Sequence, residues 1–121
     1  MLETQEIRGT DIRTLAQQAE HPQGVRKSDL RQGDWVFVTT RNSVYAICVL
    51  GDGLYSVSGG WFDRQGESAA TVAINGCTWG GSAIKQDVVA MCGLFLEFAN
   101  RVTTTRIQHI RVVRNGELAH A

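Results

Sequence analysis

The chain has 121 residues, 43% of them apolar, which is enough for one domain with its own hydrophobic core. Its 12 Lys and Arg balance 12 Asp and Glu, so it lacks the basic excess of most nucleic-acid-binding domains. Three cysteines, outside any Cys-x-x-Cys pair or Cys/His cluster, indicate reduced thiols, and neither a metal nor another cofactor is predicted.

Residues 1–24 are predicted to form one short helix and a connector. The polar start "MLETQEIRGTD" lacks the basic and then apolar order of a signal peptide, so we expect a cytoplasmic protein that does not bind membranes. Thr10 or Asp11 can cap the helix and Pro22 ends it. Its apolar stripe is narrow, consisting of Ile12, Leu15, Ala16 and Ala19.

Residues 25–121 are predicted to form a single, mainly β domain. Gly, Asn and Asp recur at intervals of roughly eight to twelve residues, the turn spacing of sandwiches and small barrels. We expect either a small antiparallel barrel, SH3-like or related, or a two-layer sandwich. The residues leave these two alternatives open.

The first predicted hairpin has an apolar pattern on both faces. A turn at Arg41 and Asn42 gives the pairs Trp35/Cys48, Phe37/Ala46 and Thr39/Val44, and we expect this face to form a core layer. The reverse face is also apolar, with Val36, Val38, Tyr45, Ile47 and Val49. Because a small barrel has only one interior, this surplus predicts a homo-oligomer, most simply a two-fold dimer.

Two further turns are predicted where Asp or Asn precedes Gly, the preferred sequence of a type I′ hairpin turn. Asp52-Gly53 would return Tyr55 and Val57 to the layer of Leu50 and Cys48. Asn75-Gly76 would pair Ile74 with Cys77 and Val72 with Trp79, all on one face.

Cys77 lies in "AINGCTWGGSAIKQD", which also suits an active-site loop with Cys77 or Ser82 as nucleophile. A reactive thiolate needs a nearby base or a helix N-terminus, and no histidine occurs between positions 22 and 108. We therefore interpret Cys77 as a packed side chain in a buried patch.

The last third of the chain repeats the strand pattern. Leu94, Leu96 and Phe98 alternate on one side of the first strand. In "TTTRIQHIRVV" the period of two breaks between Ile107 and Ile110, so we expect a bulge near Gln108-His109 that keeps Ile107, Ile110 and Val112 in the core.

Two groups of residues are candidate binding sites. The first group is the arginines around the last strand, Arg101, Arg106, Arg111 and Arg114. Together with aromatic side chains, arginines can bind the phosphates of a nucleic acid. Charged side chains that protect a strand edge from aggregation give the same pattern. The second group is Trp61, Phe62, Asp63 and Arg64, whose side chains suit a ligand pocket or a protein interface. In the alternative interpretation, one of the aromatic rings turns inward to plug the barrel and Asp63 caps a turn.

Several phrases resemble those of small, uncharacterised all-β bacterial proteins, including the kind encoded as single reading frames on mobile integron cassettes. They are "TTRNSVY", "SGGWFDRQG", "CTWGGSAI" and "EFANRVTTTRIQ", and the resemblance covers most of residues 28–113. "LRQGDWVFV" is similar to the entry strand of SH3-like barrels. Neither resemblance implies an activity or a binding residue.

These observations favour a non-enzymatic β-barrel module that binds a protein or small molecule and self-associates. The first alternative is a small enzyme with a polar site carried on loops, formed by Asp63, Arg64, Ser82, Lys85 and Asp87. The second is a nucleic-acid-binding module that uses the C-terminal arginines. Balanced charge makes it the weakest of the three.

Overall fold

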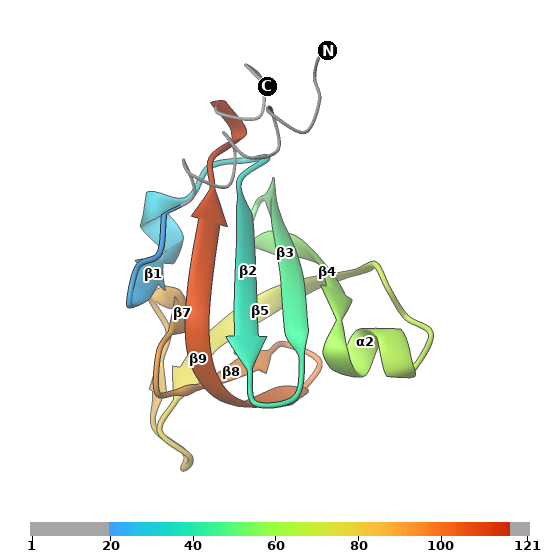
Figure 1. Cartoon of the computed structure of the whole chain (residues 1–121), viewed down its shortest axis with the longest axis vertical. Coiled ribbons are helices and arrows are strands. Elements are labelled where there is room, and N and C mark those ends of the chain that lie inside the picture. Colours follow the sequence, from blue (N-terminus) through green and yellow to red (C-terminus); the bar gives the residue numbers. More distant parts are fainter. Residues whose placement is uncertain (1–19, 117–121) are drawn as a thin grey trace.

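The computed structural model describes residues 20–116, and most of this part is β-structure (Figure 1). Its strands are β1 (Gly24–Arg26), β2 (Trp35–Thr40), β3 (Val44–Gly51), β4 (Leu54–Gly59), β5 (Ala70–Thr78), β6 (Ile84–Lys85), β7 (Val88–Met91), β8 (Phe95–Phe98) and β9 (Thr103–Val113). A 3-10 turn, η1 (Lys27–Asp29), and a short helix, α2 (Gly60–Arg64), interrupt them. The helix predicted before residue 20 lies outside the described residues. Within residues 20–116, no helix is long and apolar enough to cross a membrane.

Six antiparallel strands close into a barrel, which confirms the barrel alternative. Around it the order is β4, β3, β2, β9, β8 and β5, and the pairing of β4 with β5 completes the ring (Figure 1). β6 pairs with the end of β5. β1 and β7 form a separate two-stranded sheet, whose Val25, Val88 and Val89 belong to the same core as the barrel side chains.

The β2–β3 hairpin has the predicted register but the opposite inside face. Trp35 pairs with Cys48 and Phe37 with Ala46, as expected. The prediction that this face forms a core layer is wrong, because these side chains point outward and are only half-buried. The interior contains the other set instead, each at most 8% exposed: Val36, Val38, Tyr45, Ile47 and Val49.

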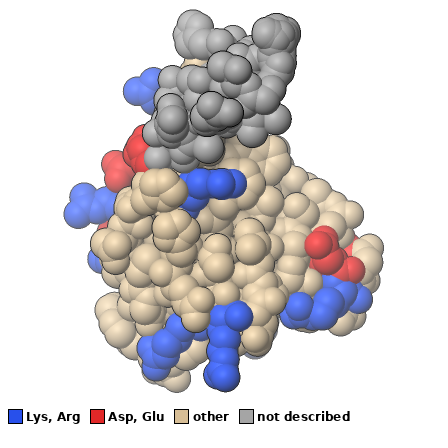
Figure 2. Space-filling view, viewed as in Figure 1, with Lys and Arg blue, Asp and Glu red and all other residues tan. Residues whose placement is uncertain are grey.

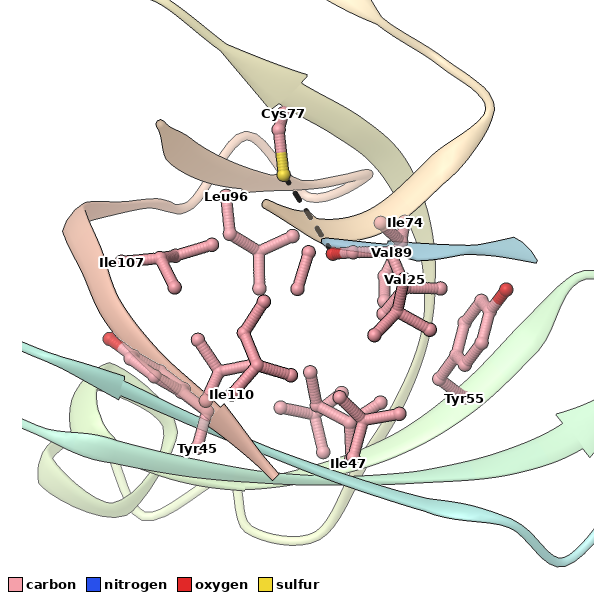
Figure 3. Packing of buried hydrophobic residues seen from close by; sticks show 14 of the residues in the cluster. Val25, Tyr45, Ile47, Tyr55, Ile74, Cys77, Val89, Leu96, Ile107 and Ile110 are labelled. Atoms are coloured by element: carbon pink, nitrogen blue, oxygen red, sulfur yellow. Dashed lines mark hydrogen bonds between the residues drawn. The ribbon is translucent and has the colours of Figure 1, made fainter. Parts of the chain in front are cut away.

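The sequence pattern could not show which face of the β2–β3 hairpin is buried, because apolar side chains occupy both faces. Branched aliphatic side chains fill much of the barrel interior (Figure 3), together with the rings of Tyr45, Phe62 and Phe98. Outside, Trp35 and Phe37 stack on each other with ring centroids 5.8 Å apart. The apolar surplus from which a dimer was predicted is thus buried within one chain, so that reason for self-association does not hold.

The predicted turn at Asp52-Gly53 is confirmed, with φ of 55° and 77° at its two residues. The prediction that Tyr55 and Val57 share a layer with Leu50 and Cys48 is wrong. Tyr55 pairs with Val49, and Val57 pairs with Ile47. Leu50 is an extra residue in the β3 ladder and forms a bulge. A register shift of one residue reverses the face of every following side chain, and this shift places Tyr55 and Val57 in the interior.

The turn predicted at Asn75-Gly76 is absent, and β5 continues through both residues to Thr78. The two residues lie instead at an irregularity where β5 pairs with β8. Gly76 has a φ of 139°, and a Cβ there would lie 2.1 Å from the Lys85 carbonyl oxygen, so the close approach of this segment requires glycine. Trp79 does not share a buried face with Ile74; it is 58% exposed.

The predictions for the last two strands are confirmed. Leu94, Leu96 and Phe98 are buried, and so are Ile107, Ile110 and Val112. The register of β9 against β2 shifts between His109 and Ile107, which makes Gln108 the extra residue of the expected bulge.

Cys77 is fully buried, as expected, although its predicted hairpin does not form. Its Sγ lies 3.9 Å from the Val89 carbonyl oxygen (Figure 3). Burial raises the pKa of this thiol to about 11, so at neutral pH it is protonated and unreactive. Cys77 is therefore a structural residue and not the nucleophile of an active site.

Cys77→Ser is expected to lower the free energy of unfolding by about 1–3 kcal/mol, because a hydroxyl replaces the thiol in an apolar layer. Urea denaturation measures this loss. In the folded wild type, a water-soluble thiol reagent should label the half-buried Cys48 and Cys92 first, and Cys77 only on unfolding. Rapid labelling of all three thiols would contradict the burial of Cys77.

Candidate functional site

One side of the barrel, here called the outer face, carries outward side chains from four neighbouring strands. It consists of Trp35, Phe37, Thr39, Val44, Ala46, Cys48, Ser56, Ser58, His109 and Arg111. None of these residues is acidic. In Figure 2 the surface over β9, β2 and β3 is largely uncharged, and charged side chains gather around its rim.

Two aromatic rings form a ridge along the middle strand, β2. Trp35 and Phe37 are two residues apart, and their rings are nearly parallel, at 11°. On one side of the ridge the paired positions on β3 and β4 hold only small side chains, namely Ala46, Cys48, Ser56 and Ser58. These four small residues, here called the floor, therefore lie beside the aromatic ridge.

On its other side the ridge meets cationic and imidazole groups. Arg111 pairs with Phe37 across the strands, and its guanidinium carbon lies 4.6 Å from the Phe37 ring centre. His109 pairs with Thr39. The His109 Nε2 lies 3.2 Å from Nδ1 of His21, which precedes β1. A hollow of about 250 Å³ opens here, lined by His21, Phe37, Thr39, Val44, His109 and Arg111.

The predicted site at Trp61–Arg64 is mainly structural. These residues belong to the short helix α2. Phe62 is fully buried, edge-on against Tyr45 and Phe98, which confirms the alternative in which a ring plugs the barrel. Trp61 packs partly buried against the core.

Asp63 and Arg64 make local contacts beside this plug. Asp63 accepts hydrogen bonds from the Ser68 hydroxyl and the Gly59 amide, and both lower the pKa of its carboxyl. A carboxyl with a lowered pKa is a poor general acid at neutral pH. The Arg64 guanidinium donates to the Ser43 hydroxyl.

The arginines around β9 have different surroundings. Arg101 occupies an exposed turn with a φ of 69°. Arg106 donates to the Gly93 carbonyl oxygen and lies over the ring of Phe95. Arg114 forms ion pairs with Glu20 and Asp34. Of these four arginines, only Arg111 lies on the outer face.

Arg114 belongs to a polar network that joins the two ends of the described chain. Its guanidinium makes two hydrogen bonds to the Glu20 carboxylate, of 2.9 and 3.1 Å, and one to the Asp29 carbonyl oxygen. It also contacts Asp34, which is 3% exposed and accepts from the backbone amides of Arg31 and Asn115 at 2.8 Å. Because its donors and acceptors satisfy each other, this network is structural.

The polar residues of the enzymatic alternative fall into separate groups. Lys85 and Asp87 form an exposed ion pair of 3.3 Å near β6, and Ser82 is exposed in the preceding loop. Among residues 20–116, no hydrogen bond or ion pair connects them with Asp63 or Arg64 at α2. In the same part of the chain, no three His, Cys, Asp or Glu side chains cluster closely enough to hold a metal ion.

Comparison with known protein families, curated proteins and solved structures finds no match.

Sequence reasoning missed Trp35 and Phe37 as surface residues because it placed them in the core. A signal was present in their predicted partners: Ala46 and Cys48 oppose the two rings, and Ser56 and Ser58 follow on the next strand. Such small and polar neighbours leave large rings poorly packed, which favours an outward face.

Asp34→Ala is expected to lower the free energy of unfolding by about 1–3 kcal/mol, because it leaves two backbone amides without their acceptor. Asp29→Ala is the matched control, since Asp29 contributes only its backbone carbonyl to the network. It should change stability by less than about 0.5 kcal/mol. Equal losses in urea denaturation would contradict the role given to the Asp34 carboxylate.

Glu20→Gln should make the protein less sensitive to acid. The hydrogen bond from Arg114 lowers the pKa of Glu20 below its ordinary value of 4.5. A lowered pKa in the folded state stabilises the wild type above pH 4.5, and this contribution is lost as pH falls through the lowered value. Because the Glu20 side chain is 47% exposed, the effect should stay below about 1 kcal/mol. Thermal melting from pH 7 to pH 3 should show a smaller decline for the variant; parallel declines would contradict this.

Proposed function

We propose that the chain is a cytoplasmic, non-enzymatic binding module that associates with a second copy of itself through the outer face. The observation that carries the proposal is the Trp35–Phe37 ridge beside the floor of small side chains. The predicted self-association is thus kept, on a different surface and for a different reason.

The chemistry of the outer face supports a protein partner. Tryptophan and arginine are enriched among residues that dominate binding energy at protein interfaces, and this face has Trp35 and Arg111 on neighbouring strands. Charged residues are depleted at the centres of interfaces, and the ridge and floor carry none. In a two-fold dimer, the ridge of each copy would lie on the floor of the other, which is the self-complementary shape that such symmetry requires.

The other functional classes have less support. The residues of the enzymatic alternative lie in separate groups, and among the C-terminal arginines Arg114 already pairs with carboxylates. An interaction module requires only the surface described above.

The test is the mass in solution, measured by light scattering after size exclusion. Wild type is expected at twice the 13.3 kDa of one chain. Ala46→Arg should be monomeric, because a long charged side chain would fill the floor beside Phe37 while the barrel interior stays unchanged.

Trp79→Ser is the matched control, since it removes a more exposed tryptophan that lies outside the outer face, and it should remain dimeric. Circular dichroism establishes that both variants are folded. A single-chain mass for concentrated wild type, or an unchanged mass for Ala46→Arg, would reject self-association through this face.

A further inference from the structure

The hollow beside the aromatic ridge has a lining of mixed chemistry. Thr39 lies at its centre in the strand register, with Val44 opposite on β3 and His109 opposite on β9. Phe37 and Arg111 form the next pair along the same strands, and His21 adds a second imidazole from the segment before β1. With a volume of about 250 Å³, the hollow is large enough for a small organic molecule.

The polar groups of this lining are donors or ionisable bases, and none is a carboxylate. Arg111 presents a planar set of N–H donors, the Thr39 hydroxyl can donate, and a protonated imidazole donates from both nitrogens. Phe37 and Val44 supply apolar walls. This combination selects a negatively charged group attached to an apolar or planar body.

Arg111 differs from Arg114 in the groups that hold its guanidinium. Arg114 binds the carboxylates of Glu20 and Asp34, which neutralise its charge locally. Arg111 lies over the Phe37 ring, and among residues 20–116 it forms no ion pair. Within the described residues the guanidinium contacts the Phe37 ring and no carboxylate, so Arg111 can pair with an anion.

The two histidines make the hollow responsive to an anion. Their nitrogens lie 3.2 Å apart, and a hydrogen bond at that distance needs one ring nitrogen without a proton as acceptor. Protonation of both rings opposes that contact, and an anion between the rings and Arg111 would compensate the added charge. Binding of an anion here should therefore take up protons.

We propose that the hollow over Thr39 binds a small organic anion, with its phosphate or carboxylate held by Arg111, the two histidines and the Thr39 hydroxyl, and its planar body against Phe37 and Val44. This proposal goes beyond self-association. The lining residues on β2, β3 and β9 belong to the same outer face, but direct ligand binding is measured separately from the mass in solution, so either proposal can fail without the other.

The first experiment is an NMR titration of the full chain, labelled with nitrogen-15, with four probes: phenyl phosphate, benzoate, inorganic phosphate and neutral benzyl alcohol. Phenyl phosphate and benzoate should shift the amides of Thr39, His109 and Arg111. Inorganic phosphate lacks the planar body and benzyl alcohol lacks the charge, so each should bind at least about tenfold more weakly. Shifts centred elsewhere, or equal binding of benzyl alcohol, would overturn the proposal. The order of phenyl phosphate and benzoate identifies the preferred anionic group.

Arg111→Gln should weaken phenyl phosphate binding by about tenfold or more, because it removes a charge-assisted contact. Arg101→Gln, in an exposed turn, is the matched control and should leave the affinity unchanged. An unchanged affinity of Arg111→Gln in the folded protein would overturn the site. The small-anion site would also be rejected if a single-stranded oligonucleotide bound more tightly than phenyl phosphate and if the Arg106→Ala, Arg111→Ala double variant lost that binding.

The pH dependence gives an independent measurement. Among the described residues, the titratable groups that line the hollow are His21 before β1 and His109 and Arg111 on β9; β2 and β3 contribute Phe37, Thr39 and Val44. Affinity for benzoate should rise as the pH is lowered from 8 to 6, because a protonated imidazole donates from both ring nitrogens and adds positive charge to the lining. His21→Gln should flatten this rise. A pH-independent affinity in wild type would contradict the role of the histidines.

Discussion

The hydrogen bonds between β4 and β5 are the constraint on which the rest of the structure depends. They join the two edges of one continuous antiparallel sheet, so one set of side chains is enclosed and the other faces outward. An open sheet could have covered either apolar face of β2 and β3. Closure selects Val36 and Val38 for the interior and leaves Trp35 and Phe37 outside. The candidate binding surface is therefore a direct result of barrel closure.

The fold was predictable where local pairing decides it. The register of Trp35 against Cys48 and the bulge at Gln108 followed from turn chemistry and from the period of two. The inside face of β2 and β3 could not be predicted in this way, since it depends on closure of the whole ring, which includes the pairing of β2 with the distant β9. Asn75-Gly76 shows a second limit: the pair that favours a hairpin turn is used here because Gly76 must approach the Lys85 carbonyl closely. Tertiary contacts overrode the local signal in both cases.

The candidate site was less predictable than the fold. Sequence reasoning selected Arg111 but grouped it with Arg114, whose carboxylate partners Glu20 and Asp34 come from the other end of the described chain. It also selected Phe62, which a single helical turn directs inward against Tyr45 and Phe98. Composition gives no information on which charges meet across a closed barrel. The resemblance to small bacterial cassette proteins stays a prediction, because no comparison bears on it.

The polar network around Arg114 also has a topological consequence. Glu20 forms a two-way backbone hydrogen-bond pair with Val112, at 2.9 and 2.8 Å, and its carboxylate holds Arg114. Residues 20 and 114 are therefore neighbours in space although they are far apart along the chain. A short engineered linker between them would allow a circular permutant to be opened at the exposed Asp52-Gly53 hairpin with every barrel pairing retained. Such a permutant would separate the contribution of chain connectivity from that of strand pairing in the order in which this barrel forms.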